Sequence, residues 1–110
     1  MSVWTIAPVA EQPETILHRW HVFETPNGTR HFCGYATAYG EGRVSSPVVA
    51  FDPATMSGRT ASGRVYRLDG PPGLHPDAAY VKGIWLARAG FSESTIVDDL
   101  EAIEPAAPSP

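Results

Sequence analysis

The sequence has 110 residues, of which 43% are hydrophobic and 18% are charged, with a formal net charge of −4 and one cysteine. This composition excludes a disordered or fibrous chain, and the length leaves room for one domain with one hydrophobic core. The single cysteine excludes an internal disulfide and a metal site made of cysteines alone.

We therefore expect one domain over residues 1–104, followed by a disordered tail at residues 105–110. The N-terminal segment lacks the basic start and the apolar run of a signal peptide. No apolar stretch approaches the ~18 residues that a membrane-spanning helix needs. Together with the lone cysteine, these features predict a soluble, cytoplasmic protein with no membrane partner.

The first element expected along the chain is a β-hairpin over about residues 16–39, centred on Asn27-Gly28. An Asn-Gly pair favours a two-residue type I′ turn, because both central residues of that turn need a positive φ. Pairing outward from such a turn places Val22 opposite Cys33. Aromatic residues then fall on both faces of the hairpin, so one face should meet the core and the other should be covered or used.

Two further β segments are expected after this hairpin. Residues 43–51 predict a third strand, in which Pro47 indicates a sheet edge or a bulge because proline has no backbone N–H. Residues 58–68 predict a second tight hairpin about Ser62-Gly63. The Gly-Pro-Pro-Gly sequence that follows ends the β region.

The last third of the chain has a helical pattern. Pro76 suits the first turn of a helix over residues 77–89, and Gly90 suits its C-cap. A second helix is expected over residues 92–103, with a strand as the alternative. The residues expected on the buried face of the first helix are Tyr80, Val81, Ile84 and Trp85. These elements predict an α+β fold, with a small antiparallel sheet of about four to five strands, curled or barrel-like, packed by one or two C-terminal helices.

A metal site is the first chemical hypothesis that the sequence raises. Three histidines and the cysteine lie within 16 residues, namely His18, His21, His31 and Cys33. Side chains three positions apart on a strand point to opposite faces, so His18 and His21 do not converge. A closed zinc site needs four converging ligands. We therefore expect no metal, and we expect Cys33 to be a small buried hydrophobic residue.

No catalytic motif is found in the sequence. A Gly-x-Ser-x-Gly elbow is absent, and the glycine-containing stretch 34–42 lacks the Lys-Ser/Thr pair of a phosphate-binding loop. The carboxylates Asp98, Asp99 and Glu101 fit the exposed face of a helix. We therefore expect a non-enzymatic protein without a cofactor.

One basic–aromatic cluster is the candidate binding site, and it comprises Arg59, Arg64, Tyr66 and Arg67. Arginine and tyrosine are enriched at the centres of protein interfaces. Small β-barrels also present such surfaces to nucleic acids, but the negative net charge opposes that alternative. A purely structural alternative is that the arginine stems cover apolar neighbours. We expect the cluster to bind another protein, with a homo-oligomer, formed between the arginines and the acidic C-terminal face, as a variant.

Parts of the chain between residues 18 and 87 resemble a group of short uncharacterised proteins from proteobacteria and their phages or plasmids. The shared pattern is Ser-Ser-Pro at residues 45–47, Phe-Asp at 51–52 and Thr-x-Ser-Gly-Arg-x-Tyr-x-Leu-x-Gly at 60–70, before a helix. The resemblance carries no activity and no catalytic residues. It implies a small accessory protein of a mobile element that binds a host protein, for example as an inhibitor of host defence.

Overall fold

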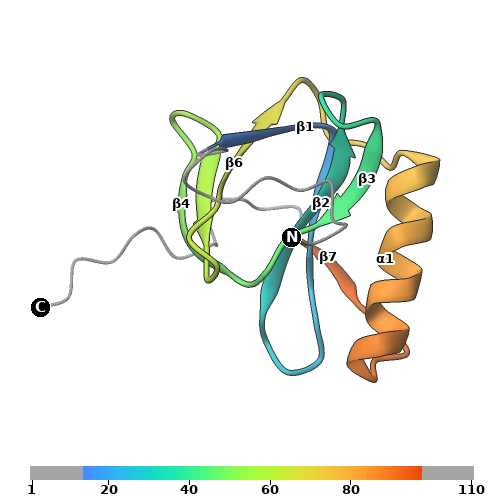
Figure 1. Ribbon diagram of the computed structural model, residues 1–110. Coiled ribbons are helices and arrows are strands. Elements are labelled where there is room, and N and C mark those ends of the chain that lie inside the picture. The colour runs from blue at the N-terminus through green and yellow to red at the C-terminus, as the bar shows by residue number, and fades with distance from the viewer. Residues whose placement is uncertain (1–13, 98–110) are drawn as a thin grey trace, which may run out of the picture.

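The computed structural model describes residues 14–97, which form one curled sheet and one helix (Figure 1). The elements in chain order are β1 (Glu14–Glu24), β2 (Arg30–Ala36), β3 (Glu41–Val44), β4 (Val48–Asp52), β5 (Ser57–Thr60), β6 (Val65–Asp69), α1 (Pro76–Ala89) and β7 (Thr95–Val97). No helix among these residues has both the length and the apolar character that crossing a membrane requires.

The sheet has seven strands in the order β3-β2-β1-β6-β5-β4, and β7 also pairs with β1. All pairs are antiparallel except β1 with β6, which run parallel. The prediction of an antiparallel sheet of four to five strands is therefore wrong in both strand count and direction, and the sheet is open rather than a barrel. The predicted strand 43–51 divides into β3 and β4 at Ser45–Pro47, where proline offers no backbone donor.

The first hairpin lies where the sequence predicts it, but its register differs by one residue. The amide of Thr25 donates to the carbonyl of Thr29, and that of Gly28 donates to the carbonyl of Thr25, both at 2.9 Å. The loop therefore holds three residues instead of two, and Val22 pairs with Phe32 rather than with Cys33. Asn27 keeps a negative φ, which a type I′ turn does not allow, while Gly28 has a φ of 90°.

The second hairpin, between β5 and β6, is confirmed. Its turn has the same construction as the first, since the Thr60 amide donates to the Arg64 carbonyl at 3.0 Å and Gly63 has a φ of 89°. A glycine supplies the positive φ in both turns, where a side chain would be strained.

A bulge bends β1 and gives it two partners along one edge. Residues 14–18 pair with β6, whereas Val22–Glu24 pair with β7. The register with β2 shifts between His18 and His21, and Arg19 within this interval has a φ of 48°. A residue in the left-handed region at a bulge bends the strand, so the two halves of β1 run in different directions.

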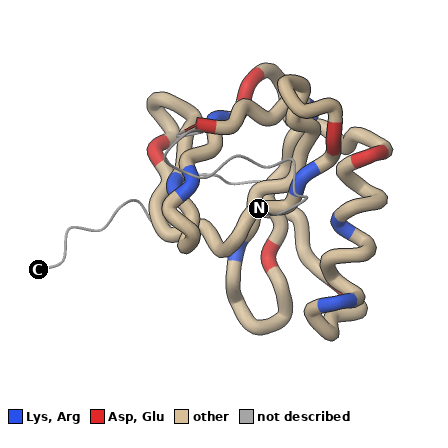
Figure 2. The backbone as a smooth tube through the Cα atoms, in the orientation of Figure 1, with Lys and Arg blue, Asp and Glu red and all other residues tan. Residues whose placement is uncertain are grey.

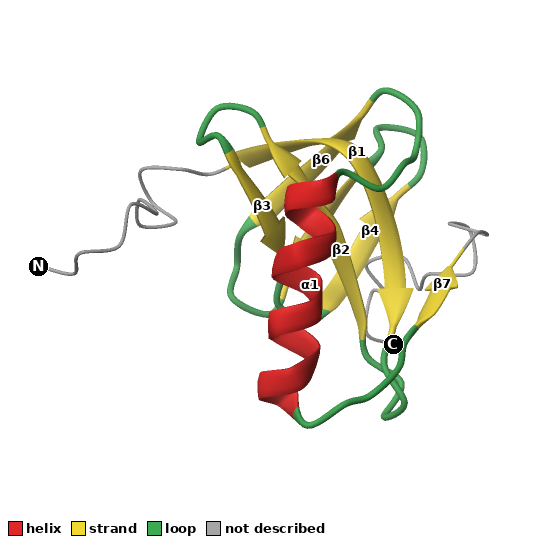
Figure 3. Ribbon diagram, turned by 90° about the vertical axis from the view of Figure 1, so that its right-hand side faces the viewer, coloured by secondary structure: helices red, strands yellow, loops and turns green. Residues whose placement is uncertain are grey.

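The curl of the sheet creates two apolar clusters on its opposite faces. The inner cluster comprises Leu17, Trp20, Val22, Phe32, Ala36, Phe51, Tyr66 and Leu68. The outer cluster lies between the sheet and α1, and it comprises Phe23, Cys33 and Ala78 with the partly buried Val44, Trp85 and Leu86. Helix α1 packs along β2 and β3 on this outer side (Figure 3).

The ends of α1 are confirmed, but its buried face is only partly as predicted. His75 is the N-cap and accepts a hydrogen bond from the Asp77 amide, while Gly90 ends the helix with a φ of 85°. Trp85 packs against the outer cluster as expected. Tyr80 and Ile84 are instead exposed, because the small Ala78 takes the position closest to the sheet.

The second predicted helix is wrong over residues 95–97, which form β7. β-branched residues in Thr95-Ile96-Val97 favour a strand, and β1 offers a free edge beyond its bulge for them to pair with. Residues 92–94 of that predicted helix are described and are not helical. Residues 98–103, with the acidic residues Asp98, Asp99 and Glu101, and the predicted tail lie outside the described residues.

Candidate functional site

The four residues of the predicted arginine–tyrosine cluster do not share one surface. Arg59 in β5 and Arg67 in β6 are exposed on the outer face of the sheet, and Arg64 is half-buried beside the β5–β6 turn. Tyr66 points inward and is 4% exposed, with its ring centroid 5.8 Å from that of Phe32. Burial raises the pKa of the Tyr66 hydroxyl. Tyr66 is therefore a core residue, and it is not the exposed apolar centre that an interface needs.

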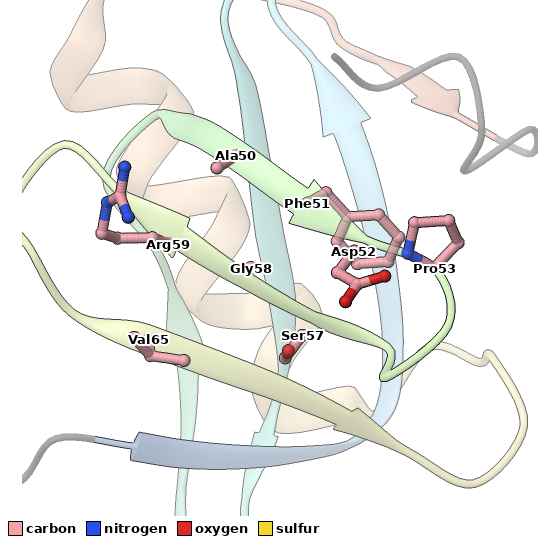
Figure 4. Close-up of a pocket in the computed structure, with 8 residues that line it drawn as sticks. All are labelled: Ala50, Phe51, Asp52, Pro53, Ser57, Gly58, Arg59 and Val65. Atoms are coloured by element: carbon pink, nitrogen blue, oxygen red, sulfur yellow. The ribbon is translucent and has the colours of Figure 1, made fainter. Parts of the chain in front are cut away.

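A shallow cleft of about 430 Å³ lies beside Arg59 on the outer face of β4, β5 and β6 (Figure 4). Arg59 stands at one end of it and Asp52 at the other. The lining residues are Ala50, Phe51, Asp52, Pro53, Ser57, Gly58, Arg59 and Val65. The cleft thus carries one charge of each sign. The one aromatic residue in its described lining, Phe51, is only 2% exposed.

Arg43 is a buried cation next to Tyr66. No sequence pattern distinguishes it from the exposed arginines. Its guanidinium forms an ion pair with Glu41 at 2.8 Å and lies 3.5 Å from the Thr15 hydroxyl. The same group lies 4.9 Å from the centroid of the Tyr39 ring. Glu41 balances the charge within the fold, although the buried Nε of Arg43 has no hydrogen-bond partner among the described residues. Arg43 is 5% exposed, so it supports the structure rather than offering a binding group.

The histidines also serve the fold. No group of three His, Cys, Asp or Glu residues within 14–97 is arranged to hold a metal ion. His31 is buried, with Nδ1 2.9 Å from the Ser45 carbonyl and Nε2 2.8 Å from the Thr29 hydroxyl. Its ring stacks on Phe23 and contacts Trp85 at a centroid distance of 4.5 Å. Burial lowers the pKa of His31, so it is neutral at neutral pH.

One face of α1 carries apolar residues that the sequence pattern predicts to be buried but that are exposed. Tyr80 is 72% exposed and Ile84, one turn later, is 38% exposed. Gly83 and Ala87 are also exposed and lie on the same side of the helix. A methyl group added at Gly83 would contact nothing within 4 Å, so no described neighbour requires glycine there.

Opposite charges mark the two ends of this face. Asp77 lies in the first turn of α1 and Arg88 in the last (Figure 2). They are eleven residues apart, which is about three helical turns, so both lie close to the line of Tyr80 and Ile84. Within residues 14–97, neither Asp77 nor Arg88 belongs to an ion pair. The face therefore has an apolar centre and one charge of each sign at its ends.

No protein-family model matches the sequence, and no curated protein or solved structure is similar enough to it to indicate a relationship.

Proposed function

We propose that this chain is a non-enzymatic protein-interaction module, and that its docking surface is the exposed face of α1, formed by Tyr80, Gly83, Ile84 and Ala87. The observation that carries the proposal is the exposure of Tyr80 beside Ile84 on one face of α1. Exposed apolar residues that gather on one face are typical of interaction surfaces, whereas scattered ones are not. Tyrosine is among the residues that contribute most to binding at interfaces.

The occupant of this surface is a second copy of the same chain. Two copies of α1 in antiparallel orientation would bring Asp77 of each copy opposite Arg88 of the other. The same arrangement would place Tyr80 of one copy against Ile84 of the other, with Gly83 near the centre, where a missing side chain allows close approach. A two-fold axis makes such a surface complementary to itself, which is how most homodimers assemble.

The dimer would leave the outer face of β5 and β6 free for a further protein. Arg59 and Arg67 are exposed there, and each protomer would present one copy of the cleft beside Arg59. We assign to this face the host-protein binding that the resemblance to mobile-element proteins implies, in the cytoplasm, where the one thiol would stay reduced. Arg64 would border the face, and Tyr66 would support it from the core.

Nucleic-acid binding is the second candidate function, and the charge pattern opposes it. Along the described backbone, the positions of Lys and Arg are interspersed with those of Asp and Glu (Figure 2). The formal net charge of −4 also repels phosphates. Two results together would favour this alternative over protein binding by the outer face of β5 and β6. The chain would bind DNA or RNA with an affinity that falls steeply as salt increases, and it would capture no protein.

The dimer is tested by exchanging its end charges. Asp77→Arg and Arg88→Asp should each weaken self-association measured by analytical ultracentrifugation, because each homodimer would then oppose like charges. An equimolar mixture of the two variants should form a heterodimer, since every Asp would again face an Arg. Tyr80→Glu should abolish the dimer, whereas Val49→Glu, which changes an exposed apolar residue on β4, should not. The proposal is contradicted if the wild-type chain stays monomeric at all concentrations. It is also contradicted if the two mixed variants associate no more tightly than either variant does alone.

A further inference from the structure

A second cleft, also of about 430 Å³, lies on the other side of α1 from the proposed docking face. It is formed by β1, the segment that leads into the helix, α1 itself and β7. The lining residues are His21, Pro72, Gly73, Leu74, Lys82 and Ile96. Trp20 fixes the entering segment, because its indole N–H donates to the Gly70 carbonyl at 3.0 Å and its own carbonyl accepts from the Gly73 amide at 2.8 Å.

Two basic side chains form the polar end of this cleft. The Nζ of Lys82 lies 3.1 Å from the Nε2 of His21, and the Nδ1 of His21 lies 3.4 Å from the Gly73 carbonyl oxygen. A hydrogen on Nδ1 would donate to that carbonyl, which leaves Nε2 as the acceptor for the Lys82 ammonium. Burial and the neighbouring Lys82 lower the pKa of His21 to about 4, so the imidazole is neutral at neutral pH.

Lys82 has no carboxylate to balance its charge among the described residues. The ion pairs within residues 14–97 are His18–Asp69, Arg30–Glu24, Arg43–Glu41 and Arg67–Glu14. Lys82 instead lies 4.7 Å from the centroid of the Phe23 ring and close to Cys33. Burial raises the pKa of the Cys33 thiol to about 11, so that group is neutral too. Within residues 14–97, the cleft thus holds one cation without a carboxylate partner among apolar side chains, which is an arrangement that favours an incoming anion.

We propose that this cleft binds a small organic acid, whose carboxylate pairs with Lys82 and whose apolar body lies against Leu74, Pro72 and Ile96. Leu74 is 55% exposed and Ile96 is 47% exposed, so both have apolar surface that a ligand would cover. A volume of this size is in the range of small-ligand sites, which combine apolar walls with a few polar groups. This site is independent of the dimer proposed above.

The ligand class follows from the number of donors in the cleft. Phosphate esters and nucleotides are held by several cationic or backbone donors together. Among the described residues that line the cleft, Lys82 is the single charged donor, because His21 serves as its acceptor. One ammonium matches one carboxylate, and the remaining lining is apolar. A monoanion with an aliphatic or aromatic body is therefore the matching chemistry.

The probe that tests this proposal is octanoate, with octanol and octylamine as matched ligands of the same chain length. Isothermal titration of the wild-type chain should show saturable octanoate binding at one site per chain, with octanol at least tenfold weaker and octylamine not bound. Lys82→Met keeps the aliphatic stem and removes the charge, so it should weaken octanoate at least tenfold. Arg30→Met removes a cation of β2 that does not line the cleft, so it should leave the affinity unchanged.

A second variant keeps the test decisive if Lys82→Met does not fold. Leu74→Glu changes an exposed residue and adds a negative charge to the rim of the cleft, so it should abolish octanoate binding. Equal affinity for octanoate and octanol overturns the proposal. The proposal is also overturned if Lys82→Met binds octanoate as tightly as the wild type. If Lys82→Met is unfolded, octanoate binding by Leu74→Glu overturns it.

Discussion

The ammonium group of Lys82 in α1 donates a hydrogen bond to the imidazole of His21 in β1, with Nζ and Nε2 3.1 Å apart. Two basic groups at this distance are compatible only while one of them is neutral, because two adjacent cations repel each other. The helix is therefore attached to the sheet partly through a contact that depends on the protonation of His21.

We predict that the chain loses stability as the pH falls through the weakly acidic range. The pKa of His21 is about 4 in the folded chain and 6.5 when exposed. Between these values the unfolded chain binds a proton that the folded chain does not, so stability is full above pH 6.5 and decreases toward pH 4. A shift of this size corresponds to about 3 kcal/mol. The lowered pKa of His31 acts in the same direction. Urea unfolding at a series of pH values measures the effect.

The control for this prediction is His21→Asn, which retains a polar side chain but does not titrate. This variant should be less stable than the wild type at neutral pH and should show a weaker pH dependence across the same range. An unchanged slope would show that His21 is not the group responsible.

Trp85 should be the side chain of α1 that contributes most to folding. Its ring packs edge-on against Phe23 at a centroid distance of 5.7 Å and also contacts His31. Trp85→Ala should destabilise the chain by about 3 kcal/mol, at the low end for buried aromatic residues because Trp85 is partly exposed. Denaturant titration gives the value. Tyr80→Ala, on the exposed side of the same helix, should change the free energy of unfolding by less than about 0.5 kcal/mol.

Gly83 and Gly90 should respond in opposite ways to alanine. A side chain at Gly83 meets nothing, so Gly83→Ala should raise the stability of the monomer by about 0.5–1 kcal/mol through helix propensity. Gly90 has a φ of 85°, so Gly90→Ala should lower the stability of the monomer by about 1 kcal/mol. Thermal unfolding at low concentration compares the two. If Gly83→Ala is destabilising, the helix surroundings differ from those described.

Gly42 in β3 allows the start of α1 to lie against the sheet. A Cβ at this position would lie 2.5 Å from the backbone carbonyl of Asp77, closer than atoms can approach. Gly42→Ala should therefore displace the helix and destabilise the chain by about 1–3 kcal/mol. Near-ultraviolet circular dichroism should report the altered packing of Trp85. A variant as stable as the wild type with an unchanged spectrum would contradict this close contact.

Local sequence signals are sufficient to place the turns and the ends of the helix in this chain. Both hairpins form where Asn27-Gly28 and Ser62-Gly63 predict them, and Pro76 and Gly90 bracket α1. The predicted register of the first hairpin is wrong because Pro26 has no N–H to donate to Thr29, as a two-residue loop at Asn27-Gly28 would require. Thr25 makes that hydrogen bond instead, which lengthens the loop by one residue. The neighbour of the Asn-Gly pair, rather than the pair itself, decides the turn type.

Local sequence signals do not predict the long-range features of this fold. The parallel pairing of β1 with β6 has no local mark, since it joins residues about fifty positions apart. The face of α1 was misassigned because Tyr80 and Ile84 repeat at the same spacing as the residues that do reach the sheet. Tyr66 alternates with Val65 and the exposed Arg67 along β6, and alternation shows that the two sets face apart without showing which set is inside. The Lys82 cleft combines three distant segments, so no single pattern indicates it.

The two partners of β1 have a consequence for the order in which the chain folds. The β1–β2 and β5–β6 hairpins join residues close in sequence, and each can form early at low entropic cost. The parallel contact between residues 14–18 and 65–69 closes a loop of about fifty residues, so its entropic cost is higher and we expect it to form after both hairpins. We expect this joining to be the rate-limiting step. Substitutions at Leu17 or Leu68, which meet in that contact, should slow folding, whereas substitutions in α1 should mainly speed unfolding.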